Sequence, residues 1–219
     1  MAEPGRPTAV VLLHAAGLTP QMWQAQVEAI ALGQAQEPET QVMAPWLAGL
    51  RPGRPAELSL TGAAAQLVGS LDAYGIENAI LVGHQLGAMV ALQVAATEPE
   101  RVAGLVLSGA MAAPGRVALA LQKGVIRMLP NRALADSGAT KSDLIKALDV
   151  IASADYGRLE KVATRTLVIA GSADPLIASA TQLAARLPNA EFAEVAGAGA
   201  HPNLEAPQKY NELLIAFLG

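Results

Sequence analysis

A pair of glycines spaced four residues apart frames the first candidate for a chemical role. The apolar run 79–83 leads into Gly83-His84-Gln85-Leu86-Gly87, and a helical pattern follows. A sharp turn from a strand into a helix strains the backbone of its central residue, and flanking glycines prevent side-chain clashes. The spacing therefore predicts a strained turn that presents the Gln85 side chain at the end of a strand.

Two further segments carry side chains that can handle protons. Asp174 directly follows the apolar run 166–170, and His201 lies in a loop rich in glycine and alanine. Carboxylate and imidazole groups are common general acids and bases. Each residue also has a structural interpretation. Asp174 before Pro175 suits the N-cap of the next helix, and His201 could be an exposed loop histidine beside Pro202.

The elements that must position these residues alternate along the chain. Short aliphatic runs predict strands at 9–14, 41–45, 79–83, 104–108, 166–170 and 191–195. Longer patterns predict helices at 21–32, 60–74, 86–97, 142–151, 177–187 and 208–217. Continuous apolar runs of this length suit strands that are buried on both faces of a parallel sheet. The alternation predicts a single α/β domain over residues 1–219, with a mostly parallel, twisted sheet of about six strands between helices.

The stretch 111–155 is unusual because it separates two predicted strands by more residues than a simple crossover needs. It also contains several prolines and glycines. Long insertions in compact domains are often lids over a functional site. We therefore predict a small lid of one or two helices, and the alternative is a crossover helix with irregular ends.

Together these segments resemble the α/β-hydrolase fold family over nearly the whole chain. Leu12-Leu13-His14-Ala15-Ala16-Gly17 resembles the family's oxyanion loop. The segment Gly171-Ser172-Ala173-Asp174-Pro175 resembles the loop of the triad acid, and residues 197–207 resemble the loop of the triad histidine. The order of turn, acid and histidine also agrees with the family. The resemblance implies the α/β-hydrolase fold and catalytic positions at Gln85, Asp174 and His201.

The chain departs from the family pattern at the residues that matter most for its chemistry. The family normally has serine where this chain has Gln85, and glutamine cannot act as the nucleophile that forms an acyl-enzyme. The family's histidine position falls on Ala200, with His201 one residue further on. The oxyanion loop has Ala15 where glycine is usual. The antiparallel strand pair that precedes the first parallel strand in many members is also missing.

One part of the implied site does not depend on side chains. The resemblance places the oxyanion hole at the backbone N–H groups of Leu86 and Ala16, which could bind a carbonyl or enolate oxygen. His14 ends the first strand beside this loop, where it could shape the loop or contact substrate. His84 is expected to be structural, with a catalytic role as the alternative.

Three functions remain open on these grounds. The first is a cofactor-free enzyme that acts without a covalent serine on a small, mainly apolar carbonyl or ester compound, by isomerisation, cyclisation, carbon–carbon bond cleavage or water-mediated hydrolysis. These reactions include lyase and cyclase chemistry. The second is an esterase-like serine hydrolase that lost its nucleophile and is inactive. The third is a non-catalytic protein that binds a small ligand in the old pocket.

Composition excludes several other classes. The chain has 219 residues, no cysteine and a formal net charge of -4, so we expect no nucleic-acid partner and no disulfide or thiolate metal site. The Gly-x-Gly-x-x-Gly dinucleotide motif, the P-loop and metal-ligand spacing are missing, so no cofactor and no metal are expected. The apolar run 9–13 is too short for a signal-peptide core, and we expect a cytoplasmic protein with no membrane association. A homodimer is left open.

Overall fold

The core of the molecule is a parallel sheet. The computed structural model describes residues 9–33, 40–51, 53, 57–111, 115–130, 132, 134 and 139–219. Six strands run in the order β2-β1-β3-β4-β5-β6 within these residues. They are β1 (Ala9–Leu13), β2 (Gln41–Met43), β3 (Ala79–His84), β4 (Val102–Ser108), β5 (Thr166–Gly171) and β6 (Ala190–Val195). The predicted α/β architecture, with about six mostly parallel strands between helices, is confirmed.

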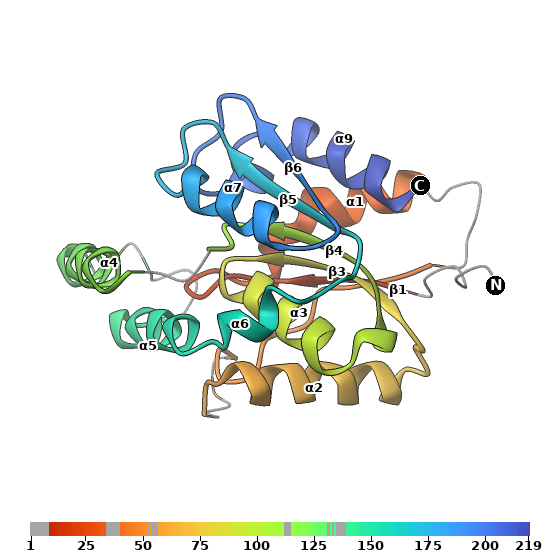
Figure 1. Cartoon of the computed structure of the whole chain (residues 1–219), viewed down its shortest axis with the longest axis horizontal. Coiled ribbons are helices and arrows are strands. Elements are labelled where there is room, and N and C mark those ends of the chain that lie inside the picture. The colour runs from red at the N-terminus through yellow and green to blue at the C-terminus, as the bar shows by residue number, and fades with distance from the viewer. Residues whose placement is uncertain are drawn as a thin grey trace.

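Helices cover both faces of this sheet (Figure 1). They are α1 (Gln24–Gly33), α2 (Leu60–Ala73), α3 (Leu86–Thr97), α4 (Arg116–Met128), α5 (Lys141–Ala152), α6 (Tyr156–Leu159), α7 (Ile177–Arg186), α8 (Pro202–Glu205) and α9 (Pro207–Leu218), with short 3-10 turns η1 (Pro20–Trp23) and η2 (Pro99–Arg101). One core joins α2, α3 and α7 to the sheet, and a second core joins α1 and α9 to the opposite face. Every residue of β1 and β3 is buried because both faces of these central strands are covered.

Two differences between the predicted and the observed elements concern the first helix and the edge strand β2. The pattern predicted as a helix over 21–32 begins as the 3-10 turn η1 and continues as α1. The strand predicted over 41–45 ends at Met43. Pro45 has no N–H group to donate to a neighbouring strand, so the ladder cannot continue through it.

The order of the strands determines where a site can form. The chain runs from β1 out to the edge strand β2 and returns to β3 on the other side of β1. Connections therefore diverge above the carboxyl ends of β1 and β3, and this is the position at which open α/β sheets bind their ligands. The end of β1 and the turn after β3 both lie at this edge.

The stretch 111–155 contains two longer helices, although residues 112–114, 131, 133 and 135–138 of it lie outside the described part of the chain. Figure 1 shows α4 and α5 beyond the end of the sheet toward which the strand arrows point. Lys123 of α4 forms an ion pair with Asp149 of α5, and Lys141 donates to the Arg127 carbonyl at 3.0 Å. The two helices therefore form one unit at the carboxyl edge.

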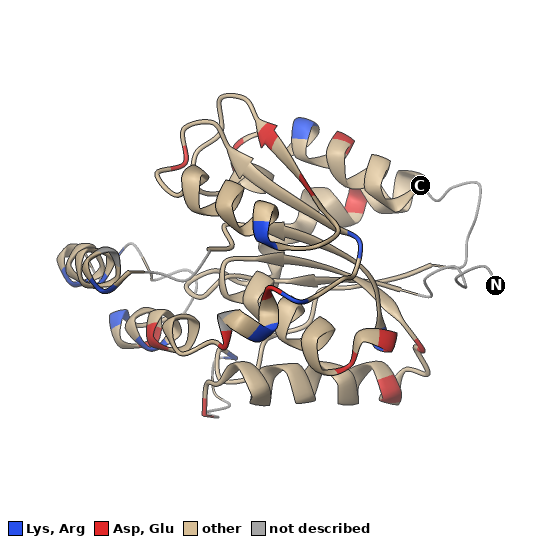
Figure 2. Cartoon of the chain, viewed as in Figure 1, with Lys and Arg blue, Asp and Glu red and all other residues tan. Residues whose placement is uncertain are grey.

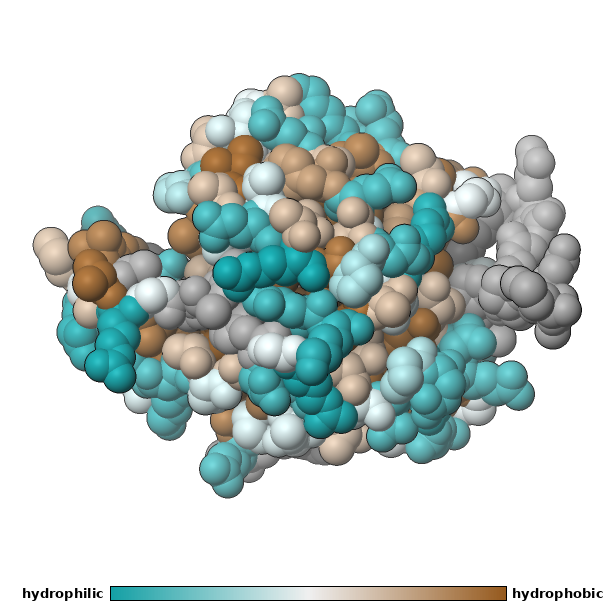
Figure 3. Space-filling view, viewed as in Figure 1, coloured by the Kyte–Doolittle hydropathy of each residue, from teal (hydrophilic) through white to brown (hydrophobic). Residues whose placement is uncertain are grey.

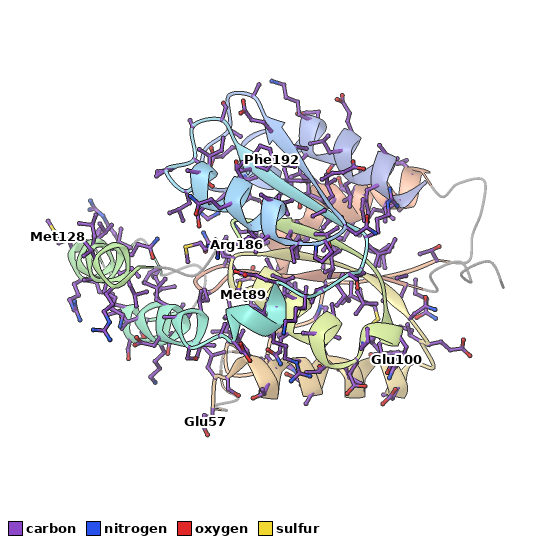
Figure 4. The ribbon with its side chains drawn as sticks, viewed as in Figure 1. Glu57, Met89, Glu100, Met128, Arg186 and Phe192 are labelled. Carbon is purple, nitrogen blue, oxygen red and sulfur yellow. The ribbon has the colours of Figure 1, made fainter. Side chains whose placement is uncertain are left out.

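The outer face of α4 carries an exposed apolar stripe. Its members recur at helical spacing and are each more than half exposed: Val117, Leu121, Val125 and Met128. Figure 3 shows this hydrophobic surface on α4, and Figure 4 shows Met128 pointing away from the rest of the molecule. The described residues leave this face of α4 uncovered.

Charged side chains lie around the periphery, and β1, β3 and β4 carry none (Figure 2). In the part of the chain that is described, no helix combines the length and the hydropathy needed to cross a bilayer. The same residues contain no cluster of three or more His, Cys, Asp or Glu side chains placed to hold a metal ion.

Candidate active site

The turn between β3 and α3 has the strained backbone that its glycine spacing predicts. Gln85 has φ 49° and ψ −111°, and it is the one non-glycine residue with positive φ in the described chain. Its N–H donates to the Ser108 carbonyl at 2.8 Å, and its carbonyl accepts from the Met89 N–H at 3.1 Å. A conformation of this kind costs about 1–3 kcal/mol, so the neighbouring strand and helix must hold it in place.

Both flanking glycines are required by close backbone contacts. A Cβ atom on Gly83 would lie 2.5 Å from the Ala88 Cα, inside the first turn of α3. A Cβ atom on Gly87 would lie 2.1 Å from the carbonyl oxygen of Leu13. The start of α3 therefore lies directly against the end of β1, and this contact brings the turn and the loop after β1 together.

The two backbone groups predicted for the oxyanion hole belong to these adjoining segments. Leu86 is the first residue of α3, so its N–H has no acceptor within the helix and lies at the positive end of the helix dipole. Ala16 is half-buried in the loop after β1. The next residue, Gly17, has φ 80°, and a Cβ atom there would lie 2.7 Å from the Leu144 Cδ2. Helix α5 therefore covers this loop with an aliphatic side chain.

Both ring nitrogens of His14 form hydrogen bonds with backbone groups. Its Nδ1 lies 2.9 Å from the Ala15 carbonyl, which can only accept, so Nδ1 carries the proton. Its Nε2 accepts the Leu47 N–H at 3.1 Å. Burial lowers the pKa of His14, which keeps the ring neutral. Both nitrogens are occupied and the ring is fully buried, which favours the loop-shaping role of His14 over the predicted substrate contact.

His201 contacts the residue immediately before the strained turn. Its Nδ1 lies 2.9 Å from the Nε2 of His84, and the two ring centroids are 5.1 Å apart. His84 is fully buried, and its Nδ1 lies 2.9 Å from the Ser108 Oγ. Burial, with a smaller contribution from His201, lowers the pKa of His84 to about 3. No local pattern in the sequence predicts this pair, because the two residues are 117 positions apart.

Asp174 is buried at 4% exposure in the loop after β5. Its Oδ1 accepts the Leu176 N–H at 2.8 Å, and its carbonyl accepts the Ile177 N–H at 3.0 Å. These bonds close the turn that leads into α7. The predicted N-cap role of Asp174 is wrong, because the N-cap of α7 is Leu176. Among the described residues, no hydrogen bond joins the Asp174 carboxylate to His201.

Glu205 is a structural member of the site that the residue-by-residue interpretation missed. Its carboxylate accepts the Gly199 N–H at 2.6 Å and the His201 N–H at 3.0 Å. These two hydrogen bonds lower the pKa of Glu205. The exposed carboxylate thus fixes the backbone of the histidine loop, which sets the direction of the His201 side chain.

A model of the "Alpha/beta hydrolase family" matches residues 10–213, nearly the whole chain. The chain belongs to this family. A protein of Azorhizobium caulinodans named "Putative carbamate hydrolase RutD" is 29% identical over 252 aligned residues, which cover 98% of this chain and 92% of the relative.

Solved structures of the alpha/beta hydrolase fold superimpose over almost the same extent. A hydrolase from Pseudomonas aeruginosa PA01 has a TM-score of 0.81 and 21% identity, covering 98% of this chain and 91% of that one. The enol-lactonase from Burkholderia xenovorans LB400 has a TM-score of 0.80 and 19% identity, covering 98% and 92%. At these identities the two structures establish the shared fold.

The buried histidines make the stability of the protein depend on pH. The pKa of His84 is about 3 in the folded chain against an ordinary value of 6.5, so between these values the unfolded chain binds a proton that the folded chain does not. Stability should therefore fall as the pH drops from about 6.5, by up to about 1.4 kcal/mol per pH unit from His84 alone. Urea unfolding at pH 7, 6 and 5 measures this slope. The variant His84→Gln should flatten it, and a wild-type stability independent of pH would contradict the burial of a neutral His84.

Relief of the strain at residue 85 should be measurable as well. Glycine tolerates positive φ, so Gln85→Gly should stabilise the fold by about 1 kcal/mol after its extra chain entropy in the unfolded state is counted. Gln66→Gly in the exposed part of α2 is the matched control and should destabilise by about 1 kcal/mol. Equal losses in both variants would show that residue 85 is not strained.

Proposed function

We propose that this alpha/beta hydrolase acts without a cofactor on a small, mainly apolar carbonyl or ester compound and uses no serine nucleophile. The observation that carries the proposal is Gln85 in the strained turn between β3 and α3, the place where the family resemblance expects the nucleophile. An amide side chain donates and accepts hydrogen bonds but cannot form an acyl-enzyme. Water-mediated hydrolysis, isomerisation, cyclisation and carbon–carbon bond cleavage remain compatible with such a site.

The oxyanion-binding part of the site supports this proposal. The N–H of Leu86 lies at the start of α3, and the contact of Gly87 with Leu13 holds that start against the loop that contains Ala16. Backbone donors at a helix N-terminus favour the negative charge that develops on a carbonyl oxygen. In the proposed site, Leu86 and Ala16 donate to this oxygen and Gln85 orients the substrate or a water molecule.

Proton transfer is assigned first to His201. Its ring is half-buried and contacts His84, which adjoins Gln85 in the chain. Asp174 is the second candidate, and its Oδ1 is already engaged by the Leu176 N–H. That engagement also favours the alternative of an inactive serine hydrolase, because the acid of a working triad must hold its histidine.

Two observations support an apolar carbonyl substrate: an aliphatic side chain covers the oxyanion loop, and a relative is named for the hydrolysis of a carbonyl compound. Leu144 of α5 lies over Gly17 in the oxyanion loop, which supports a small helical lid within 111–155 that closes on the substrate with aliphatic side chains. The relative from Azorhizobium is named for the hydrolysis of a carbamate, a carbonyl compound. This name favours water-mediated hydrolysis over the other three reactions.

Initial rates on short p-nitrophenyl esters test the proposal. We expect steady turnover by the wild-type protein without an initial burst of one equivalent of p-nitrophenol, because no acyl-enzyme forms. Gln85→Ala and His201→Ala should lose about 100-fold in kcat/KM, and Asp174→Ala should also lose activity. The exposed Gln66→Ala on α2 is the control and should retain the wild-type rate. A burst would disprove the non-serine mechanism, and no turnover above background would exclude ester hydrolysis and favour an inactive or ligand-binding protein.

A further inference from the structure

A chain of hydrogen bonds runs from α9 through the sheet to the histidine loop. The Tyr210 hydroxyl lies 3.5 Å from the Ser108 Oγ, which lies 2.9 Å from the His84 Nδ1. The His84 Nε2 then lies 2.9 Å from the His201 Nδ1. Tyr210, Ser108 and His84 are completely buried, and the half-exposed His201 ends the chain. In this series of hydrogen bonds, the donor or acceptor role of each group therefore determines which atom of the next group can carry a proton.

The Ser108 end determines which nitrogen of His84 is protonated. The Ser108 hydroxyl donates to the Gly83 carbonyl at 3.3 Å, which leaves its oxygen free to accept from the His84 Nδ1–H. A neutral imidazole has one N–H, and burial keeps His84 neutral. Its Nε2 therefore carries a lone pair.

This lone pair can only accept from His201. The His201 Nδ1 must then carry a proton, and its Nε2 is left with a lone pair. We propose that His84 is the residue that positions His201, by accepting its Nδ1–H and so making the His201 Nε2 the base of the site. The role of this Nε2 as a base rests on the proposed function, whereas the arrangement of protons does not.

Two carboxylates could have taken the place of His84, and both are engaged elsewhere. Asp174 accepts the Leu176 N–H, and Glu205 accepts the backbone N–H groups of Gly199 and His201. Glu205 fixes where the His201 backbone lies, and His84 fixes its ring. A neutral acceptor also suits this place, because a carboxylate beside the buried Ser108 and Tyr210 would have to be desolvated.

The protonation form of His201 can be read directly from the uniformly ¹⁵N-labelled full chain by long-range ¹H–¹⁵N correlation of its three histidine rings. His201→Gln assigns the His201 signals. At a pH where all three rings are neutral, we expect the His201 Nδ1 to be protonated and its Nε2 to be unprotonated. Histidine in water favours the opposite form, so a free His201 would show the reverse pattern.

Variants separate the proposal from its alternatives. His84→Phe removes the acceptor and should convert His201 to the Nε2–H form, whereas the amide oxygen of His84→Gln can accept the same N–H and should preserve the Nδ1–H form. Asp174→Asn is the control and should leave His201 unchanged. If His84→Phe does not fold, Ser108→Ala serves instead, because it frees His84 to reverse its protons and should give a mixture of His201 forms.

An Nε2–H form in the wild type would overturn the proposal. A change in Asp174→Asn with none in His84→Phe would overturn it as well, because Asp174 would then be the positioning residue. The NMR measurement needs no substrate. If it shows the expected Nδ1–H form of His201 and the ester assay shows no turnover, only the proposed function is disproved. The reverse pattern together with ester turnover would disprove only the role of His84.

Discussion

Replacing Gly87 with alanine is expected to destabilise the fold by about 3 kcal/mol or more, the largest stability effect we predict. A Cβ atom at this position would lie 2.1 Å from the carbonyl oxygen of Leu13 and 2.9 Å from that of His14. Both atoms belong to the backbone at the end of a central strand, so neither can move without disturbing the sheet. Urea unfolding followed by circular dichroism measures the loss of unfolding free energy.

Gly69→Ala is the matched control for this substitution. Gly69 lies in α2 with no atom within 4 Å of a new Cβ, and it is exposed to solvent. Alanine there should stabilise the protein by about 1 kcal/mol, because it favours the helix. If Gly87→Ala stayed within about 1 kcal/mol of the wild type, the start of α3 would not lie against β1, and the oxyanion-binding part of the proposed site would lose its basis.

The double variant Gln85→Ser/Ala200→His is expected to gain at least about 100-fold in kcat/KM on short p-nitrophenyl esters. The strained turn would present the serine hydroxyl beside the N–H of Leu86. On the alignment proposed from the family resemblance, a histidine at 200 would occupy the position of the family's base. A covalent intermediate should form, so the variant should release p-nitrophenol in an initial burst that the wild type lacks. Stopped-flow absorbance measures this burst.

The single variants separate the contributions to this gain. Gln85→Ser alone has a hydroxyl without a base at 200 and should gain much less, and Ala200→His alone should show no burst. A folded double variant with no burst would contradict the placement of Gln85 and Ala200 at the nucleophile and histidine positions. A burst would show that the backbone of a serine hydrolase is intact around these two residues.

Local patterns in the sequence were sufficient to predict the fold and the strained backbone of the turn at Gln85. Short apolar runs predicted the central strands β1, β3 and β5, because a strand buried on both faces needs a continuous apolar segment. The edge strands β2 and β6 are only partly buried and were predicted from shorter or mixed runs. The spacing of Gly83 and Gly87 predicted the strain at Gln85, since only glycine permits the close contacts on either side. The end of β2 before Pro45 also has a local cause, which the apolar pattern alone did not reveal.

The hydrogen-bond partners of the site were decided by the tertiary structure. Asp174 and His201 looked like two members of one triad, yet Asp174 bonds its own turn and His201 bonds His84. The direction of the His201 side chain depends on the hydrogen bonds that Glu205 accepts from the backbone of the histidine loop. The sequence does not indicate these bonds, so it cannot show whether position 200 or position 201 faces the site. The backbone conformation of a segment depends on its own residues and their immediate neighbours, so the sequence can predict it. The partner of a buried polar side chain depends on which distant segments the fold brings within hydrogen-bond distance, and only the packed structure determines that.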